Sequence, residues 1–396
     1  MTPSSLPYQH FTSPFDKWAV QPSFVLGEYL FILCAAVALY HACKSSRQHL
    51  LVWVGALIAG TANDVIFMAL PLVDNFWQAQ ATVMITARLP LYIPCVYVCF
   101  MYYPTVSVWR LGLPPLGRAA LTGLAAIAFY APYDVVGAKF LWWTWHDTDR
   151  PILHRVLGAP IGSTVWVITF VAAFSYLINH ALDRDSTVKA RTALRGLAMV
   201  AGLSTIIMVL QMTVLQQLDG GIPGIRGLIV VVLLYATLVA FGWRRRASDA
   251  ATWPRLDKLL HAMTVLYFTT LVVIMGVFKP EAHVSLSVHQ TYGPCHVEAK
   301  DITGTVRYEY ICIEDFDEDF TFDLGNLPDD KSRWYAVTGR AHTNYAQWLG
   351  GVSAMGLIGA LLYTLLLRAP RNTLSCPGRS RHSSRPSRAT GTAKRS

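Results

Sequence analysis

Residues 23–43 of the chain read SFVLGEYLFILCAAVALYHAC, and this segment decides the fold class. Glu28 is its one acidic side chain, and it holds no Lys or Arg. A helix of roughly 20 apolar residues crosses the ~30 Å hydrocarbon core of a bilayer. The segment therefore predicts a transmembrane helix.

Eight further apolar segments predict about nine transmembrane helices in all. Of the 396 residues, 53% are hydrophobic and 14% are charged, whereas a soluble domain carries roughly 25% charged residues. The predicted spans lie near residues 23–43, 50–72, 77–103, 117–138, 157–181, 193–217, 226–243, 259–278 and 346–367. The third contains Pro90 and Pro94, which membrane helices tolerate as kinks. The predicted fold is an all-α polytopic membrane protein with a small β-rich loop between spans 8 and 9.

The distribution of Lys and Arg predicts the orientation. Counted with the first turn of the span that follows each, the loops after spans 1, 3, 5 and 7 hold thirteen Lys and Arg, and those after spans 2, 4 and 6 hold four. Because cytosolic loops are the basic ones, the N-terminal tail (1–22) is expected on the exoplasmic side of a plasma membrane or endomembrane. The basic tail (368–396) is expected to be disordered in the cytosol. The net charge of +9 is then a topology signal, and no nucleic-acid partner is expected.

A long loop at residues 279–345 connects an eight-span bundle (23–278) to the last span. It holds twelve Asp and Glu against six Lys and Arg. Alternating residues around Gly304 predict a β-hairpin. A register in which Val297 faces Tyr310 also places Cys295 opposite Cys312, and an exoplasmic loop is oxidising, so a disulfide is expected there. Two free thiols are the alternative.

Four charged residues lie well inside predicted spans, where they are costly and suggest function. They are Glu28, Asp64, Arg88 and Asp134, and all are placed at the midplane or in the exoplasmic half. Asp64 and Arg88 are candidates for a structural ion pair between spans 2 and 3. Glu28 and Asp134 are candidates for lining a wet pocket.

The loop after span 4 contains the densest mixture of aromatic and acid–base residues, FLWWTWHDTDRPILHR at 140–155. An aromatic belt at the membrane interface explains its tryptophans, Trp142, Trp143 and Trp145. His146, Asp147 and Asp149 have three interpretations. They form an ordinary loop in which Asp147 caps the turn and Asp149 pairs with Arg150, an acid–base site, or a metal site.

These residues lead to one functional hypothesis and two rivals. The hypothesis is a site facing the outer leaflet that binds or acts on an amphipathic lipid or isoprenoid. The site is built from Glu28, Asp64, Asp134, His146, Asp147 and Asp149, with the carboxylates and the histidine in acid–base roles. The rivals are a proton- or ion-coupled transporter using Asp64, Arg88 and Asp134, and a scaffold whose acidic loop binds a partner. The residues name neither a cofactor nor a metal.

Three motifs resemble an uncharacterised family of multi-pass membrane proteins defined by a domain of unknown function. They are GTANDVIFMALP at 60–71, KFLWWTWHDTD at 139–149 and HQTYGPC at 289–295. The resemblance covers most of residues 23–367 and implies an integral membrane protein without an assigned activity. The Trp-rich exit of span 4, followed by Gly158-Ala159-Pro160, is also similar to carotenoid-biosynthesis membrane hydratases. No catalytic residue is transferred from that group.

Overall fold

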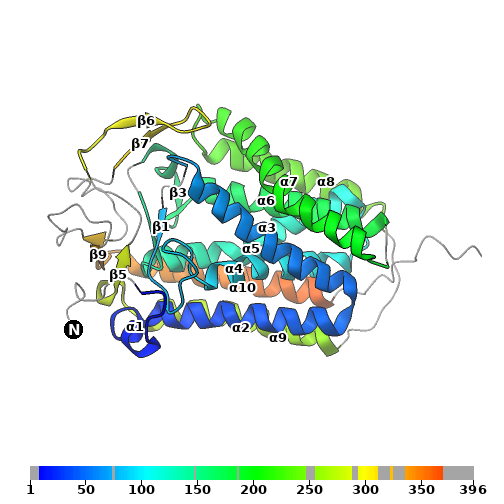
Figure 1. The fold of residues 1–396 in the computed structure, drawn as a ribbon, viewed down its shortest axis with the longest axis horizontal. Helices are drawn as coiled ribbons and strands as arrows, with labels where there is room; N and C mark the ends of the chain where they lie inside the picture. Colours follow the sequence, from blue (N-terminus) through cyan, green and yellow to red (C-terminus); the bar gives the residue numbers. More distant parts are fainter. Residues whose placement is uncertain are drawn as a thin grey trace, which may run out of the picture.

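The computed structural model describes residues 9–73, 76–146, 149–184, 187–246, 255–287, 293–310, 322–323 and 335–368. Its described part is a bundle of long helices with short strands at one end (Figure 1). The helices are α1 (Pro14–Val20), α2 (Pro22–Ser45), α3 (Arg47–Ala69), α4 (Tyr92–Trp109), α5 (Pro115–Lys139), α6 (Ile161–Arg184), α7 (Ala190–Gln217), α8 (Ile225–Trp243), α9 (Arg255–Val277) and α10 (Tyr345–Arg368). Eight of these are long and apolar enough to cross a membrane, which confirms the fold class.

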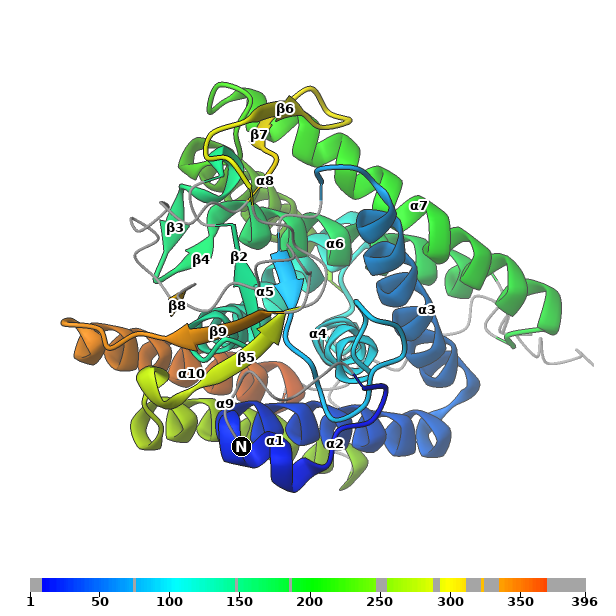
Figure 2. The ribbon, with the colours of Figure 1, turned by 60° about the vertical axis from the view of Figure 1, so that its left-hand side comes forward.

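The third predicted span is wrong in its first half. Helix α4 begins at Tyr92 rather than near residue 77, and Pro90 forms a β-bridge with Met84. Pro94 lies in the first helical turn, where a missing N–H costs no intrahelical hydrogen bond, so it starts the helix instead of kinking it. At 1.5 Å per residue, α4 is about 27 Å long. Figure 2 looks nearly along α4, which packs against α2, α3 and α5.

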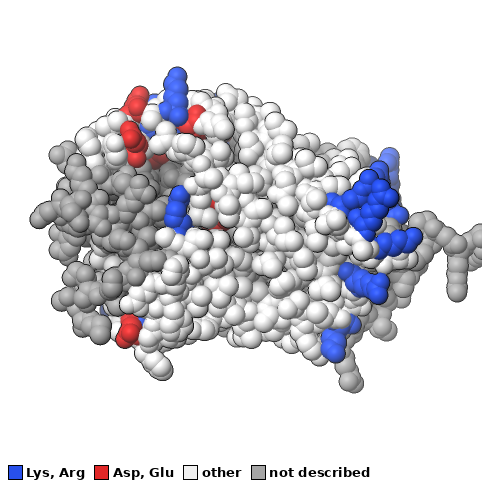
Figure 3. Space-filling view, in the orientation of Figure 1, with Lys and Arg blue, Asp and Glu red and all other residues white. Residues whose placement is uncertain are grey.

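Successive connections lie at opposite ends of the bundle (Figure 1). In Figure 3, Lys and Arg gather at one end, and most of the visible Asp and Glu lie at the other. We call these the basic end and the loop end. The loop end carries the segments after α3, α5, α7 and α9, and the first described residues pack there, because Thr12 N donates to the carbonyl of Thr82 at 2.9 Å.

Tryptophans of the 140–155 segment close the loop end of the bundle. Strand β2 (Trp143–Trp145) pairs antiparallel with β1 (Phe76–Gln78). Trp142 and Trp143 are 0% and 3% exposed, so the prediction that they form an interfacial belt is wrong. Their rings occupy space left by two glycines, since a Cβ on Gly27 or Gly137 would lie 2.1 Å from the ring of Trp142 or Trp143, respectively.

The predicted hairpin is present, but its predicted register is wrong by one residue. Strand β6 (Glu298–Lys300) pairs with β7 (Val306–Tyr308) so that Glu298 faces Tyr308. Asp301 N donates to the carbonyl of Thr305, and Gly304 has a φ of +79°. This is a three-residue loop with its glycine in the left-handed region, not a two-residue turn.

The register change removes the facing-pair argument for the Cys295–Cys312 disulfide. Cys312 lies outside the described residues, so the bond stays a prediction. The other short elements of the loop end are β3 (Arg155–Val156) paired with β4 (Ala159–Pro160), and the three-stranded sheet β5–β9–β8. The strands of that sheet are β5 (Val284–Ser287), β9 (Tyr335–Gly339) and β8 (Phe322–Asp323). Two 3₁₀ turns, η2 (Arg150–Ile152) and η3 (Pro280–Ala282), complete the described elements.

Candidate functional site

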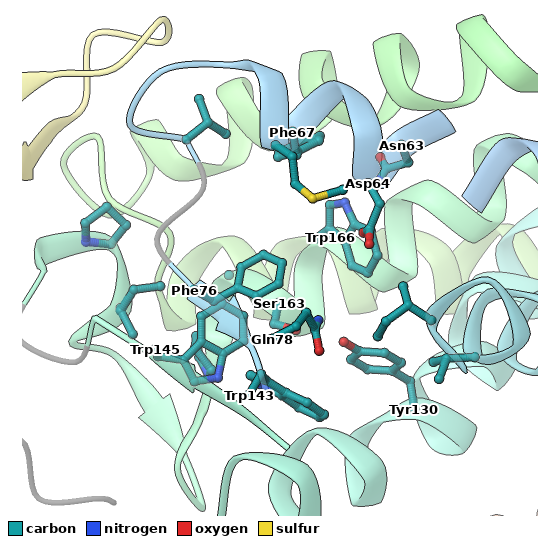
Figure 4. A pocket seen from close by; sticks show the side chains of 18 of the residues that line it. Asn63, Asp64, Phe67, Phe76, Gln78, Tyr130, Trp143, Trp145, Ser163 and Trp166 are labelled. Atoms are coloured by element: carbon teal, nitrogen blue, oxygen red, sulfur yellow. The ribbon is translucent and has the colours of Figure 1, made fainter. Parts of the chain in front are cut away.

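A pocket of about 190 Å³ lies among α3, α4, α5 and α6, beneath the β1–β2 ribbon. Aromatic side chains dominate its wall (Figure 4). They are Phe67, Phe76, Tyr97, Phe100, Tyr130, Tyr133, Trp143, Trp145 and Trp166. An apolar wall with a few polar groups is the usual composition of a small-molecule site.

The rings of the wall pack against one another before any ligand enters. Tyr133 and Trp143 have ring centroids 4.8 Å apart, and Phe76 and Trp145 are 5.1 Å apart. The Phe100 and Tyr130 rings meet edge to face at 5.0 Å. Because such pairs prefer these offset and edge-on geometries, the wall is largely preorganised.

Asp64 is the acidic residue of the pocket lining, and a chain of hydrogen bonds holds it. The Tyr97 hydroxyl donates to Asp64 Oδ1 at 2.5 Å. Asn63 Nδ2 donates to the Tyr97 oxygen at 3.2 Å, and the Thr205 hydroxyl donates to Asn63 Oδ1 at 3.2 Å. The chain joins α7, α3 and α4, and it fixes Tyr97 as a donor toward the carboxylate.

Arg88 lies close to this carboxylate. Its Nη1 donates to the carbonyl of Met68 at 2.8 Å, one turn of α3 beyond Asp64. The two side chains are close enough for their charges to interact. The proposed Asp64–Arg88 ion pair stays a prediction, but the two residues do face the same region of the loop end.

Glu28 anchors the segment before α4 and does not line the pocket. It is 0% exposed, and its carboxylate accepts hydrogen bonds from Thr82 N at 3.0 Å and from the Thr82 hydroxyl at 2.6 Å. Lys17, in α1, donates to Gln21 at 2.6 Å. Burial lowers the pKa of Lys17 to about 7, and the nearby Glu28 opposes the shift.

Asp134 lies directly behind the pocket wall. It is 2% exposed and forms a side-chain hydrogen bond with Ser163, a residue that does line the pocket. Its Oδ1 has no hydrogen-bond partner among the described residues. Asp134 is therefore adjacent to the site but separated from the open space by Ser163.

Asp149 joins the 140–155 segment to the hairpin, and the predicted Asp149–Arg150 pair is wrong. The Asp149 carboxylate accepts a hydrogen bond from Tyr308 N at 2.8 Å and pairs with Arg307 at 3.4 Å. Arg150 instead forms an ion pair with Glu298. The hairpin supplies a charge of opposite sign to each residue, Arg307 to Asp149 and Glu298 to Arg150. Each ion pair therefore joins two segments instead of two neighbouring residues.

Arg307 connects this contact to the pocket, because it also lines the pocket wall. Its Nε donates to Asp301 at 2.8 Å. Although burial opposes ionisation of Asp301, hydrogen bonds from Thr303 and Arg307 lower its pKa. The guanidinium of Arg307 is thus held between two carboxylates, those of Asp149 and Asp301.

His146 is 0% exposed, with its ring centroid 6.4 Å from that of Tyr308. Asp147 lies outside the described residues. Among the described residues, no group of three or more His, Cys, Asp and Glu side chains is arranged to hold a metal ion. The acid–base assignment of His146, Asp147, Asp149, Asp134 and Glu28 stays a prediction.

Sequence reasoning found Asp64 but missed the residues that make it part of a site. Tyr97 and Trp166 lie in apolar helices and give no signal beyond their aromatic character. Asn63, which directly precedes Asp64, was the detectable clue, because a second polar residue in a membrane helix needs a partner.

The family model for a domain of unknown function, DUF7802, matches residues 10–367. The chain belongs to this family. The matched range includes the described helices from α1 to nearly the end of α10, the pocket lining and the hairpin. The chain matches no curated protein and no solved structure.

Proposed function

We propose that this integral membrane protein binds an amphipathic lipid or isoprenoid in the aromatic pocket, with the polar end of the ligand at Asp64. The pocket itself carries the proposal. Its lining is apolar apart from a few polar residues, of which Asp64 and Asn63 lie together on α3. A chain of methylenes fits the ring wall, and a polar head fits the hydrogen-bonded cluster.

The charge asymmetry supports an exoplasmic position for the pocket. Lys and Arg gather at the basic end (Figure 3), which is the end expected in the cytosol. In this orientation the N-terminus is exoplasmic and the C-terminus is cytosolic. The pocket then opens in the outer-leaflet half, on the same side as the hairpin and the predicted Cys295–Cys312 bond.

Glu28 and Asp149 have structural roles, which favours binding over catalysis. Glu28 is occupied by Thr82, and Asp149 is occupied by Arg307 and the Tyr308 backbone. Each of these bonds holds two segments of the loop end together. Acid–base action on a bound lipid would need a group that reaches the open space, and Asp64 is the carboxylate that does so.

The experiment is lipid extraction from the purified protein followed by mass spectrometry. Met212, on α7, lines the pocket, and Met212→Trp would fill part of it. Leu210→Trp is the matched control, because Leu210 is on the same helix and is 63% exposed. We expect one lipid class to copurify with the wild type and the control and to be depleted from Met212→Trp. Equal lipid content in all three proteins would refute the proposal and favour a transporter or a scaffold.

A further inference from the structure

We propose that the pocket selects an amphiphile with a cationic amino head, such as a long-chain quaternary or primary amine. The ammonium lies among the aromatic rings beside Asp64, and the alkyl chain follows the apolar wall. This inference rests on the proposed lipid-binding function and names the class of headgroup.

The first argument is the charge of the lining. Among the described residues of the lining, the charged side chains are Asp64 and Arg307, and the Arg307 guanidinium already pairs with Asp301 and Asp149. One cation between two carboxylates leaves that cluster with a net negative charge. Arg88 offsets part of the charge of Asp64 but does not belong to the lining. The remaining charge favours a cation, since the cation of the described lining, Arg307, is already paired with carboxylates.

The second argument is the position of the Asp64 carboxylate. Oδ1 accepts the hydrogen bond of the Tyr97 hydroxyl at 2.5 Å. The hydrogen-bond chain through Asn63 and Thr205 keeps the Tyr97 hydroxyl directed at Oδ1. With Oδ1 held in this way, Oδ2 is the oxygen assigned to the ammonium group.

The third argument is the chemistry of the rings next to this carboxylate. The Tyr97 ring lies 5.9 Å from that of Trp166, and Trp166 stacks on Phe170 with an interplanar angle of 7°. Electron-rich ring faces attract cations, Trp most strongly, and sets of such rings bind quaternary ammonium groups. A neutral head would gain little from these faces, and a sulfate or phosphate would be repelled by Asp64.

The experiment compares two brominated probes of equal chain length, an alkyl trimethylammonium and an alkyl alcohol, with the full chain held in dodecyl maltoside. Bromine quenches the fluorescence of tryptophans that it contacts, and Trp143, Trp145 and Trp166 line the pocket. The wild type is expected to bind the ammonium probe at least about tenfold more tightly than the alcohol. Asp64→Asn should lose this preference and still bind the alcohol, which also shows that the variant is folded.

Two control variants separate the possible failures. Glu281→Gln removes an exposed acidic group at the loop end outside the pocket, and it should keep the preference. Met212→Trp should weaken the binding of both probes. Equal affinity for the two probes in the wild type, or a preference that survives Asp64→Asn, would overturn the cationic headgroup while leaving lipid binding intact. Failure of both probes to quench the wild type would overturn the proposed function as well.

Discussion

Gly27→Ala tests whether Trp142 is a core residue that seals the bundle. A Cβ at position 27 would lie 2.1, 2.5 and 2.7 Å from three carbons of the Trp142 ring. Carbon atoms in contact are separated by about 3.5–4.0 Å, so the ring must retreat by roughly 1.4 Å. It has little room to do so, since it is fully buried, stacks on Phe24 and donates to the Ser23 hydroxyl at 3.1 Å.

The size of the effect follows from two costs and one gain. Overpacking a well-packed core costs about 1–3 kcal/mol, and displacing the ring also threatens a hydrogen bond that contributes about 1 kcal/mol. Alanine in place of glycine in a helix returns about 1 kcal/mol. The expected net loss in the free energy of unfolding is about 1–3 kcal/mol.

The assay is the thermal unfolding midpoint of the purified protein in one detergent, with Gly202→Ala as the control. Gly202 lies within α7, and a Cβ there would meet nothing within 4 Å. At about 2–4 °C per kcal/mol, Gly27→Ala should lower the midpoint by several degrees, whereas Gly202→Ala should leave it unchanged or raise it. Equal midpoints for the two variants would mean that Trp142 does not fill this space and that the belt interpretation was correct.

Three further predictions concern contacts at the loop end. Asp149→Ala removes one of the two carboxylates beside the half-buried Arg307 and the acceptor of the Tyr308 N–H. Because Asp301 still pairs with Arg307, we expect a loss in the free energy of unfolding of about 1–3 kcal/mol and faster proteolysis of the hairpin; an unchanged cleavage rate would contradict this. Glu28→Gln replaces an acceptor of two Thr82 hydrogen bonds, and a cost of about 1–3 kcal/mol should appear as a lower thermal midpoint, which an unaltered midpoint would refute. Burial lowers the pKa of His283 from 6.5 to about 4. Between pH 6.5 and 4 the unfolded chain therefore binds a proton at this histidine that the folded chain does not bind. The free energy of unfolding should fall as the pH drops through this range. His283→Leu should flatten that slope, and an identical slope would exclude this histidine as its cause.

The helices could be predicted because each depends on a property of consecutive residues. Runs such as 23–43 are long and apolar enough to cross a bilayer, and they need no tertiary information. The prediction of a helix over the first half of the third span was wrong because it used the same property. Hydropathy does not distinguish an apolar helix from a buried loop, and residues 79–84 are largely buried. They contact the N-terminal segment and Glu28.

The site depends on residues that are far apart in the chain, and the sequence does not reveal those contacts. Asp64 was recognisable because a carboxylate inside a span needs an explanation. Its hydrogen-bond donor Tyr97 comes from the next helix, and the partner of Asp149 is Arg307, which follows it by 158 residues. The expected partner of Asp149 was its neighbour Arg150, because only local pairs can be read directly from a sequence.

The most direct test of lipid binding is an experimental density map of the protein reconstituted in a bilayer of native lipids. The account predicts an elongated density inside the pocket that follows the ring wall and ends beside the Asp64 carboxylate, and that is missing in Met212→Trp. A wild-type pocket that is filled by its own side chains, or that holds only separate water-sized densities, would contradict it.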